Sequence, residues 1–214
     1  MWQLDGSKAS FRSTHLTGQL DVEVPAAGVT HLAVAIHPDR PRTSIDAAIM
    51  KLMLPDGAPL LIDAYVRGTD LVATYSESPN HPCQSRIYWR VESEADYFGI
   101  QILISVQTPL LDAYPDLKIV SQLTQNATRI DHGVAVAPLP GLDLCYAELA
   151  DDSNLASTEV QGNRITSSLF PGSLEKGVIR SARILGCFLA QEAGDELASS
   201  LQRRYARSAP PLTT

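Results

Sequence analysis

The chain has 214 residues, of which 44% are hydrophobic and 19% are charged, a composition close to the average for globular proteins. A chain of this length buries roughly 70% of its unfolded surface, so it can fold without a disulfide or a structural metal. Its net charge is −7 and its one basic cluster lies at residues 203–207, which argues against a nucleic-acid partner because phosphate binding requires a clustered basic surface.

Alternation of apolar and polar residues predicts strands in the first quarter of the chain. Residues 19–24 alternate, with Leu20, Val22 and Val24 on one side, and the pattern resumes over residues 30–36 after a break at Pro25. Residues 44–54 are ambiguous, because their apolar side chains also fit the spacing of a short amphipathic helix.

The strand signal is densest after residue 60. Residues 60–67 and 70–77 flank a short turn signal, which is compatible with a hairpin. A two- or four-residue loop would place Asp70 opposite Arg67 and Thr74 opposite Asp63, whereas a three-residue loop would reverse this parity. Further strands are predicted over residues 86–92, 97–108, 117–123, 129–137, 142–149 and 164–170.

The end of the chain has a helical pattern. Asp195 is a candidate N-cap, apolar residues recur every four positions, and basic residues gather at the far end, so we expect a helix over residues 195–207 and a frayed tail over 208–214. Residues 177–190 fit a long strand better than a helix. The chain is therefore expected to form a single domain, residues 1–214: an antiparallel β-sandwich of about ten or more strands with one C-terminal helix, or alternatively a closed β-barrel.

One face of the predicted sheet carries polar and aromatic side chains. Alternate residues of a strand project to opposite faces, so the apolar face of each strand between residues 60 and 107, including Trp89, is assigned to the core. Such a polar face can simply contact solvent, or it can bind a ligand, with flat tyrosine rings stacking on a sugar while charged and amide groups form hydrogen bonds. The candidate ligand-binding residues are Asp63, Tyr65, Arg67, Arg86, Tyr88, Arg90, Glu92 and Gln101.

No sequence motif identifies an enzyme. The chain lacks phosphate-binding glycine loops and a G-x-S-x-G elbow, and its three distant cysteines form no metal-ligand spacing, so no cofactor is expected. The N-terminus has no signal-peptide core and the longest apolar stretch is too short to cross a bilayer, which predicts a cytoplasmic protein without a membrane partner.

Three functions remain open on this evidence. The first is a non-catalytic domain that binds a carbohydrate or a similar polar small molecule. The second is a carbohydrate-active enzyme, which would require at least one acid/base candidate to converge with tyrosine and arginine in one pocket. The third is a structural or self-assembling protein, a homo-oligomer that uses a strand edge or the terminal helix. The acid/base candidates are Asp63, Glu77, His81, Glu92 and His132.

Overall fold

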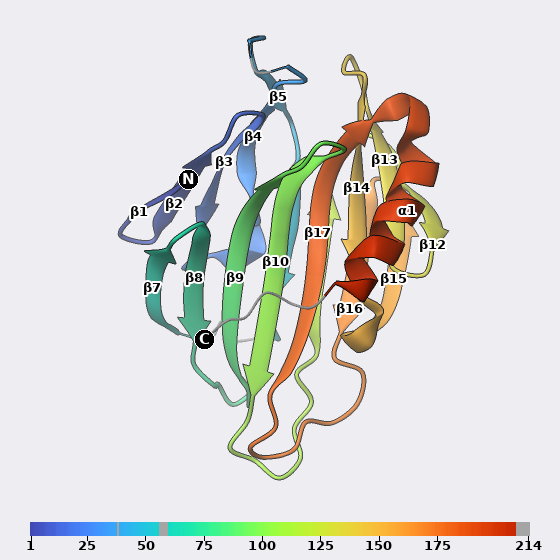
Figure 1. Cartoon of the computed structure of the whole chain (residues 1–214). Helices are drawn as coiled ribbons and strands as arrows, with labels where there is room; N and C mark the ends of the chain where they lie inside the picture. Colours follow the sequence, from blue (N-terminus) through green and yellow to red (C-terminus); the bar gives the residue numbers. More distant parts are fainter. Residues whose placement is uncertain (38, 56–59, 209–214) are drawn as a thin grey trace.

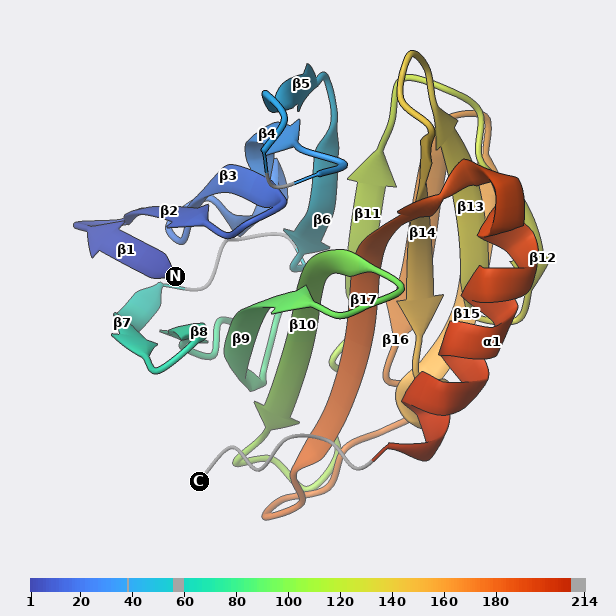
Figure 2. The same cartoon turned by 45° about the horizontal axis from the view of Figure 1, so that its top comes forward.

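The computed structural model describes residues 1–37, 39–55 and 60–208, which form three antiparallel sheets and one α-helix (Figure 1). The eight-stranded sheet forms one layer, and the five- and four-stranded sheets lie behind it (Figures 1 and 2). This arrangement confirms the predicted β-sandwich with a C-terminal helix. The two edge strands of the eight-stranded sheet do not pair with each other within the described residues, so the sheet does not close into the alternative barrel.

The N-terminal sheet is a five-stranded meander in which the first two strands were not predicted. The strand expected over residues 19–24 ends at Asp21, because the Asp21 carboxylate accepts a hydrogen bond from the Glu23 amide at 3.1 Å and turns the chain. A 3₁₀-helix, Pro25–Ala27, follows. The strands are β1 (Trp2–Asp5), β2 (Lys8–Arg12), β3 (Leu16–Asp21), β4 (Thr30–Val34) and β5 (Thr43–Ile45).

The four-stranded sheet, in the order β15-β16-β11-β6, continues the same layer, and the Val29–Ile49 bridge joins it to the N-terminal sheet. Residues 48–53 form a strand and not a helix. Their helix-like spacing has a local cause: the β6–β11 register shifts between Ala48 and Lys51, so Ile49 and Met50 are both buried in succession. The strands are β6 (Ala48–Met53), β11 (Leu117–Gln122), β15 (Leu155–Gln161), which was not predicted, and β16 (Arg164–Leu169).

The eight-stranded sheet has the order β12-β13-β14-β17-β10-β9-β8-β7. The single strand predicted over residues 129–137 is in fact a hairpin, because Gly133 adopts a positive φ of 73° and reverses the chain. The preference for a strand over residues 177–190 is confirmed. The strands are β7 (Leu61–Arg67), β8 (Asp70–Tyr75), β9 (Gln84–Ser93), β10 (Phe98–Gln107), β12 (Thr128–Asp131), β13 (Val134–Leu139), β14 (Leu144–Ala150) and β17 (Arg180–Ala190).

The main hydrophobic core lies between the two layers and contains Trp89 as predicted, at 1% exposure. A carboxyl group is enclosed among these apolar side chains. The carboxylate of Glu148 on β14 accepts hydrogen bonds from Ser121 on β11 and Ser167 on β16, so it joins the inner faces of the two layers. Burial raises the pKa of Glu148 to about 7.

Helix α1 (Gly194–Arg207) packs on the outer face of the eight-stranded sheet (Figure 1). Its buried residues Ala198, Leu201 and Tyr205 contact a second apolar cluster on β13, β14 and β17. Asp195 lies in the first turn and not at the N-cap, because a 3₁₀-helix (Gln191–Ala193) leads directly into α1. The expected tail beyond residue 208 falls outside the described residues. Within the described chain, no helix has the length and apolar character needed to cross a bilayer.

Candidate functional site

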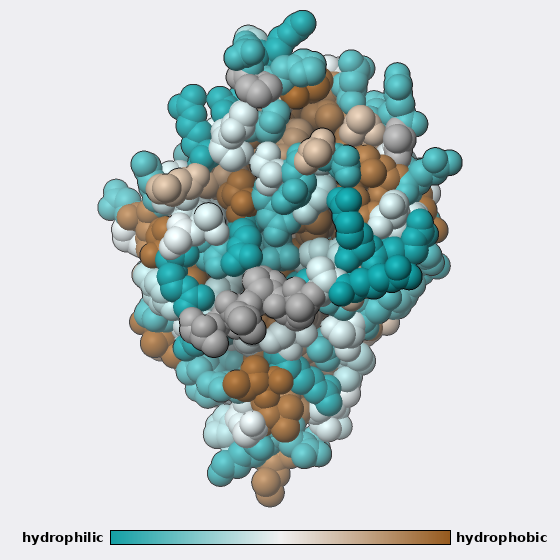
Figure 3. All heavy atoms as spheres, in the orientation of Figure 1, coloured by the Kyte–Doolittle hydropathy of each residue, from teal (hydrophilic) through white to brown (hydrophobic). Residues whose placement is uncertain are grey.

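All eight candidate residues lie on one face of one sheet, the outer face of the eight-stranded sheet. Helix α1 covers this face over β13, β14 and β17, and no described helix covers it over β7, β8, β9 and β10 (Figure 1). We call the outward-facing residues of these four strands the open outer face, although some of them, such as Val72 and Leu103, are buried. Figure 3 shows mainly hydrophilic side chains on this side of the molecule, with apolar side chains in smaller separate patches.

The hairpin formed by β7 and β8 has the register predicted for a two-residue loop. Arg67 lies opposite Asp70, and Asp63 lies opposite Thr74. The loop residue Gly68 has a φ of 58°, a conformation that glycine adopts at little cost in a tight hairpin. Because β8 pairs in turn with β9, this register aligns the outward residues of all four strands.

The strongest polar contact of the open outer face joins Asp70 and Arg90. The Arg90 guanidinium donates from Nε to Asp70 Oδ1 at 2.6 Å and from Nη2 to Oδ2 at 2.8 Å, a bidentate geometry that fixes the plane of the guanidinium. Asp70 is buried and Arg90 is half-buried. The contact with Asp70 raises the pKa of Arg90, so this residue is a permanently charged, pre-oriented donor.

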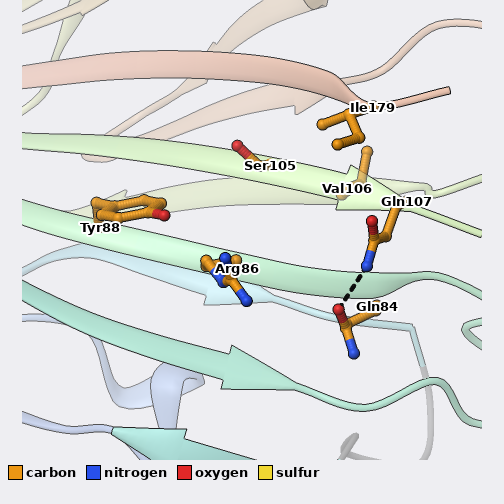
Figure 4. Close-up of a pocket in the computed structure, with 7 residues that line it drawn as sticks. All are labelled: Gln84, Arg86, Tyr88, Ser105, Val106, Gln107 and Ile179. Atoms are coloured by element: carbon orange, nitrogen blue, oxygen red, sulfur yellow. Dashed lines mark hydrogen bonds between the residues drawn. The ribbon is translucent and has the colours of Figure 1, made fainter. Parts of the chain in front are cut away.

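Tyr88 is too deeply buried to stack on a sugar. Its side chain forms a small buried cluster with Val72 and Leu103, and the Arg67 guanidinium lies 5.9 Å from its ring centroid. Only 5% of Tyr88 is exposed. The Tyr88 ring is therefore not available for stacking on a sugar, and its hydroxyl is directed along the strand toward Arg86 (Figure 4).

A hollow of about 260 Å³ lies at one end of the open outer face (Figure 4). Gln107 donates a hydrogen bond to Gln84 at 2.6 Å across it, and Ser105 is bonded to Ser181 at 2.9 Å. Much of its polar lining is therefore already paired. The hollow is lined by Gln84, Arg86, Tyr88, Ser105, Val106, Gln107 and Ile179.

A larger hollow, about 470 Å³, lies where the open outer face meets the C-terminal end of α1; we call it the helix-side hollow. It brings together three of the candidates, Arg90, Glu92 and Gln101, with residues that the sequence did not single out. Gln101 comes from β10 and is buried, and its side-chain amide makes no hydrogen bond within the described chain. The lining residues are Arg90, Val91, Glu92, Ser93, Glu94, Tyr97, Gln101, Arg183, Tyr205 and Ser208.

Glu92 and Tyr97 form a hydrogen-bonded pair in the helix-side hollow. The Tyr97 hydroxyl donates to Glu92 Oε2 at 2.9 Å. Burial raises the pKa of Glu92, and the bond from Tyr97 together with the charge of Arg90 opposes that rise. Burial likewise raises the pKa of Tyr97, so this residue remains a neutral hydroxyl donor at ordinary pH.

Arg183 on β17 forms the wall between the helix-side hollow and the helix. Its Nε donates to Asp151 Oδ2 at 2.7 Å, and its Nη2 donates to the main-chain oxygens of Tyr205 and Ser208, each at 2.6 Å. The guanidinium also lies 4.4 Å from the Tyr205 ring centroid. A buried cation thus binds the carbonyl end of α1, where the helix dipole favours positive charge, and it holds that end against the sheet.

The remaining candidates do not converge on this hollow. Asp63, Tyr65 and Arg67 lie on edge strand β7, away from both hollows. The acid/base candidates are also dispersed: His81 is buried in the loop before β9, beside Ser85 at 2.9 Å, and His132 lies in the β12–β13 turn. The condition set for the enzyme hypothesis, convergence of acid/base groups with tyrosine and arginine, is met by Glu92 alone.

A hollow of about 790 Å³ lies elsewhere, between β4, β5 and the four-stranded sheet. Its lining includes His31 and Asp46 but no tyrosine, tryptophan or arginine, the side chains that stack on sugars or form forked hydrogen bonds. Within the described chain, no group of three or more His, Cys, Asp or Glu side chains is placed to hold a metal ion.

Sequence reasoning missed Tyr97, Arg183 and Tyr205 as members of the hollow. Tyr97 was assigned only as the first residue of a predicted strand, which in fact begins at Phe98, and Tyr205 was assigned only as a helix residue. Arg183 carried a usable signal, because a charged side chain in the middle of a long apolar strand must have buried partners. Its partners lie 32 and 22 residues away, at Asp151 and Tyr205, and no local pattern reveals them.

Comparisons with known proteins are sparse. No model of a known protein family matches the chain, and neither does any curated protein sequence. A solved structure described as a "putative kojibiose phosphorylase from human microbiome" superimposes with a TM-score of 0.50 at 8% sequence identity. The match covers 94% of this chain and 36% of that protein, so the chain spans about a third of the protein's length. At this identity the likeness establishes a shared fold.

Proposed function

We propose that the chain is a non-catalytic binding domain, and that it binds a carbohydrate or a similar polar small molecule in the helix-side hollow. The observation that carries the proposal is the grouping of two arginines, two glutamates, a glutamine amide and two tyrosines around one hollow of about 470 Å³. This volume falls within the range of about 300–1,000 Å³ that is usual for small-molecule sites, whereas the hollow of about 260 Å³ does not.

The chemistry of the lining suits a ligand with several hydroxyl groups. Arg90 is oriented by Asp70 and, in the described chain, its Nη1 makes no hydrogen bond, so that nitrogen can donate to a ligand. Glu92 supplies carboxylate acceptors, and the Gln101 amide supplies both a donor and an acceptor. A polyol needs this mixture, because each hydroxyl donates one hydrogen bond and accepts others.

The structural neighbour supports the choice of a carbohydrate in a limited way. Its description names an enzyme of kojibiose, a carbohydrate, but similar folds host unrelated functions. The arrangement of residues in the hollow, rather than the likeness, therefore carries the argument. Two carboxyl groups line the hollow, Glu92 and Glu94, which is the number that glycoside hydrolysis uses, so catalysis is the second candidate function. Binding is preferred because the sequence contains no catalytic motif.

Isothermal titration calorimetry with a panel of monosaccharides and of α- and β-linked disaccharides tests the proposal. The informative variant is Gln101→Leu, which keeps the side-chain volume and removes two hydrogen-bonding groups. Gln107→Leu is the matched control, since Gln107 lies on the same strand and the same face but lines the other hollow. We expect Gln101→Leu to weaken binding about 10-fold and Gln107→Leu to leave it unchanged.

If the native protein binds none of the sugars in the panel, the proposed ligand class is rejected. If the two variants lose affinity equally, the ligand does not bind in the helix-side hollow. Hydrolysis or phosphorolysis of any disaccharide in the same samples, detected by chromatography, would replace the binding function with an enzymatic one.

A further inference from the structure

Strand β7 is an unusual edge of the eight-stranded sheet. It is seven residues long, and it contains neither lysine nor proline, which commonly protect such edges from pairing with another chain. Both edge strands of this sheet lie near the other layer, β7 beside β1 and β12 beside β15, and β12 also contacts α1. Strand β12 has four residues, so β7 is the longer of the two edges (Figure 1).

The side chains of β7 are also unusually exposed for their type. Ile62 is 55% exposed, Tyr65 39% and Val66 37%, and Leu60, just before the strand, is 78% exposed. These residues project to both faces of the sheet at its edge. Apolar side chains that remain exposed along an unpaired strand mark an interaction surface.

The sequence of β7 is self-complementary in one antiparallel register. If two copies of the strand pair about a two-fold axis through Tyr65, Asp63 of each copy lies opposite Arg67 of the other, and the two Tyr65 residues face each other. Shifting the register by two residues loses both charge pairs. In this register the numbers of paired residues differ by an even number, so the outer faces of both sheets lie on the same side.

The same register groups the apolar residues on the inner side of the edge. Val66 of each copy lies opposite Ala64 of the other, and Ile62 is its diagonal neighbour. Opposite residues of antiparallel strands are close enough for such side chains to contact, and diagonal neighbours can also reach one another. One register therefore covers the exposed apolar residues and pairs the charged ones.

We propose that β7 is a self-association edge, through which two copies of this chain join their eight-stranded sheets in the antiparallel register centred on Tyr65. The proposal does not depend on ligand binding in the helix-side hollow, which lies on other strands. The contact is a short strand pair, so the dimer is a weak one, with a dissociation constant of about 10 µM. The charge pairs select the register, whereas backbone pairing and apolar contact hold the dimer.

Cysteine cross-linking tests the register directly. Tyr65→Cys places two thiols at the two-fold axis, where opposite Cα atoms lie about 4.5–5.5 Å apart, within the range of a disulfide. Ile62→Cys is the matched control on the same strand, since its two copies would lie about 20 Å apart. The native cysteines do not interfere, because all three are buried: Cys83, Cys145 and Cys187.

We expect mild oxidation to convert Tyr65→Cys into a covalent dimer and to leave Ile62→Cys monomeric. Failure of Tyr65→Cys to cross-link, or equal cross-linking of both variants, overturns the proposal.

Sedimentation of the native chain provides the second test, with a mass that rises from 23.2 kDa toward twice that value between about 1 and about 100 µM. Asp63→Arg places like charges opposite each other and should raise the dissociation constant about 10-fold or more; a strictly monomeric native chain, or no effect of this variant, contradicts the proposal.

Discussion

Glu148 lies at 1% exposure inside the sandwich, and we predict that its carboxyl group makes the protein less stable as the pH rises from 4.5 to about 7. In the unfolded chain this group has its ordinary pKa near 4.5, whereas in the folded protein burial raises the pKa to about 7. Between these values the folded state keeps a proton that the unfolded state has lost. The free energy of unfolding therefore falls with rising pH across this window.

The size of the effect follows from the shift. A difference between 4.5 and about 7 corresponds to about 3 kcal/mol, fully present below pH 4.5 and lost once the pH exceeds about 7. Hydrogen bonds from Ser121 at 2.6 Å, Ser167 at 3.2 Å and Tyr146 at 3.3 Å favour the charged form. They limit the rise in pKa but do not cancel the cost of burying the charge.

Glu148→Gln is the informative variant, because its side chain has nearly the same shape and stays neutral at every pH. Urea denaturation of both proteins from about pH 5 to about pH 8 should show the variant gaining about 2–3 kcal/mol relative to the native chain across this range. Taking the difference removes the contributions of other titrating groups. Glu159→Gln changes an exposed residue on β15 and is the control. Its free energy of unfolding should differ from that of the native protein by the same amount at every pH. Parallel curves for Glu148→Gln and the native protein would refute the reasoning.

Three further predictions concern the packing of the outer face and the core. Arg183→Met leaves the Asp151 carboxylate buried without its partner, so we expect a loss of about 3–5 kcal/mol in urea denaturation; a loss below about 1 kcal/mol would contradict it. Gly99→Ala places a methyl group 2.2 Å from the Gly186 carbonyl oxygen, a backbone atom that cannot turn away, and should cost about 3 kcal/mol, which an unchanged Tm would disprove. We expect the three cysteine thiols to resist a thiol reagent such as Ellman's in the native state and to react only in denaturant. Burial raises the pKa of all three, Cys83, Cys145 and Cys187, to about 11 for Cys83 and Cys145.

Local patterns were sufficient for much of the fold. Alternation between residues 60 and 107 assigned the correct face to every candidate residue, because successive side chains of a strand must leave the backbone on opposite sides. The hairpin register of Arg67 and Asp70 was left open between loops of opposite parity, and the structure selects the two-residue loop. Where alternation failed, as at Ile49 and Met50, a bulge had placed two consecutive residues in the core.

The sequence alone thus determined the faces of the strands, the C-terminal helix and the sandwich class, because each depends on residues close together in the chain. Only the tertiary structure decided that β17 lies between β10 and β14, and that α1 covers one half of the outer face. It also brought Arg183 to Asp151 and Tyr205, which created the helix-side hollow. The physical reason is that the order of distant strands and the docking of a helix depend on the summed packing of residues far apart in the chain, and no short segment carries that sum.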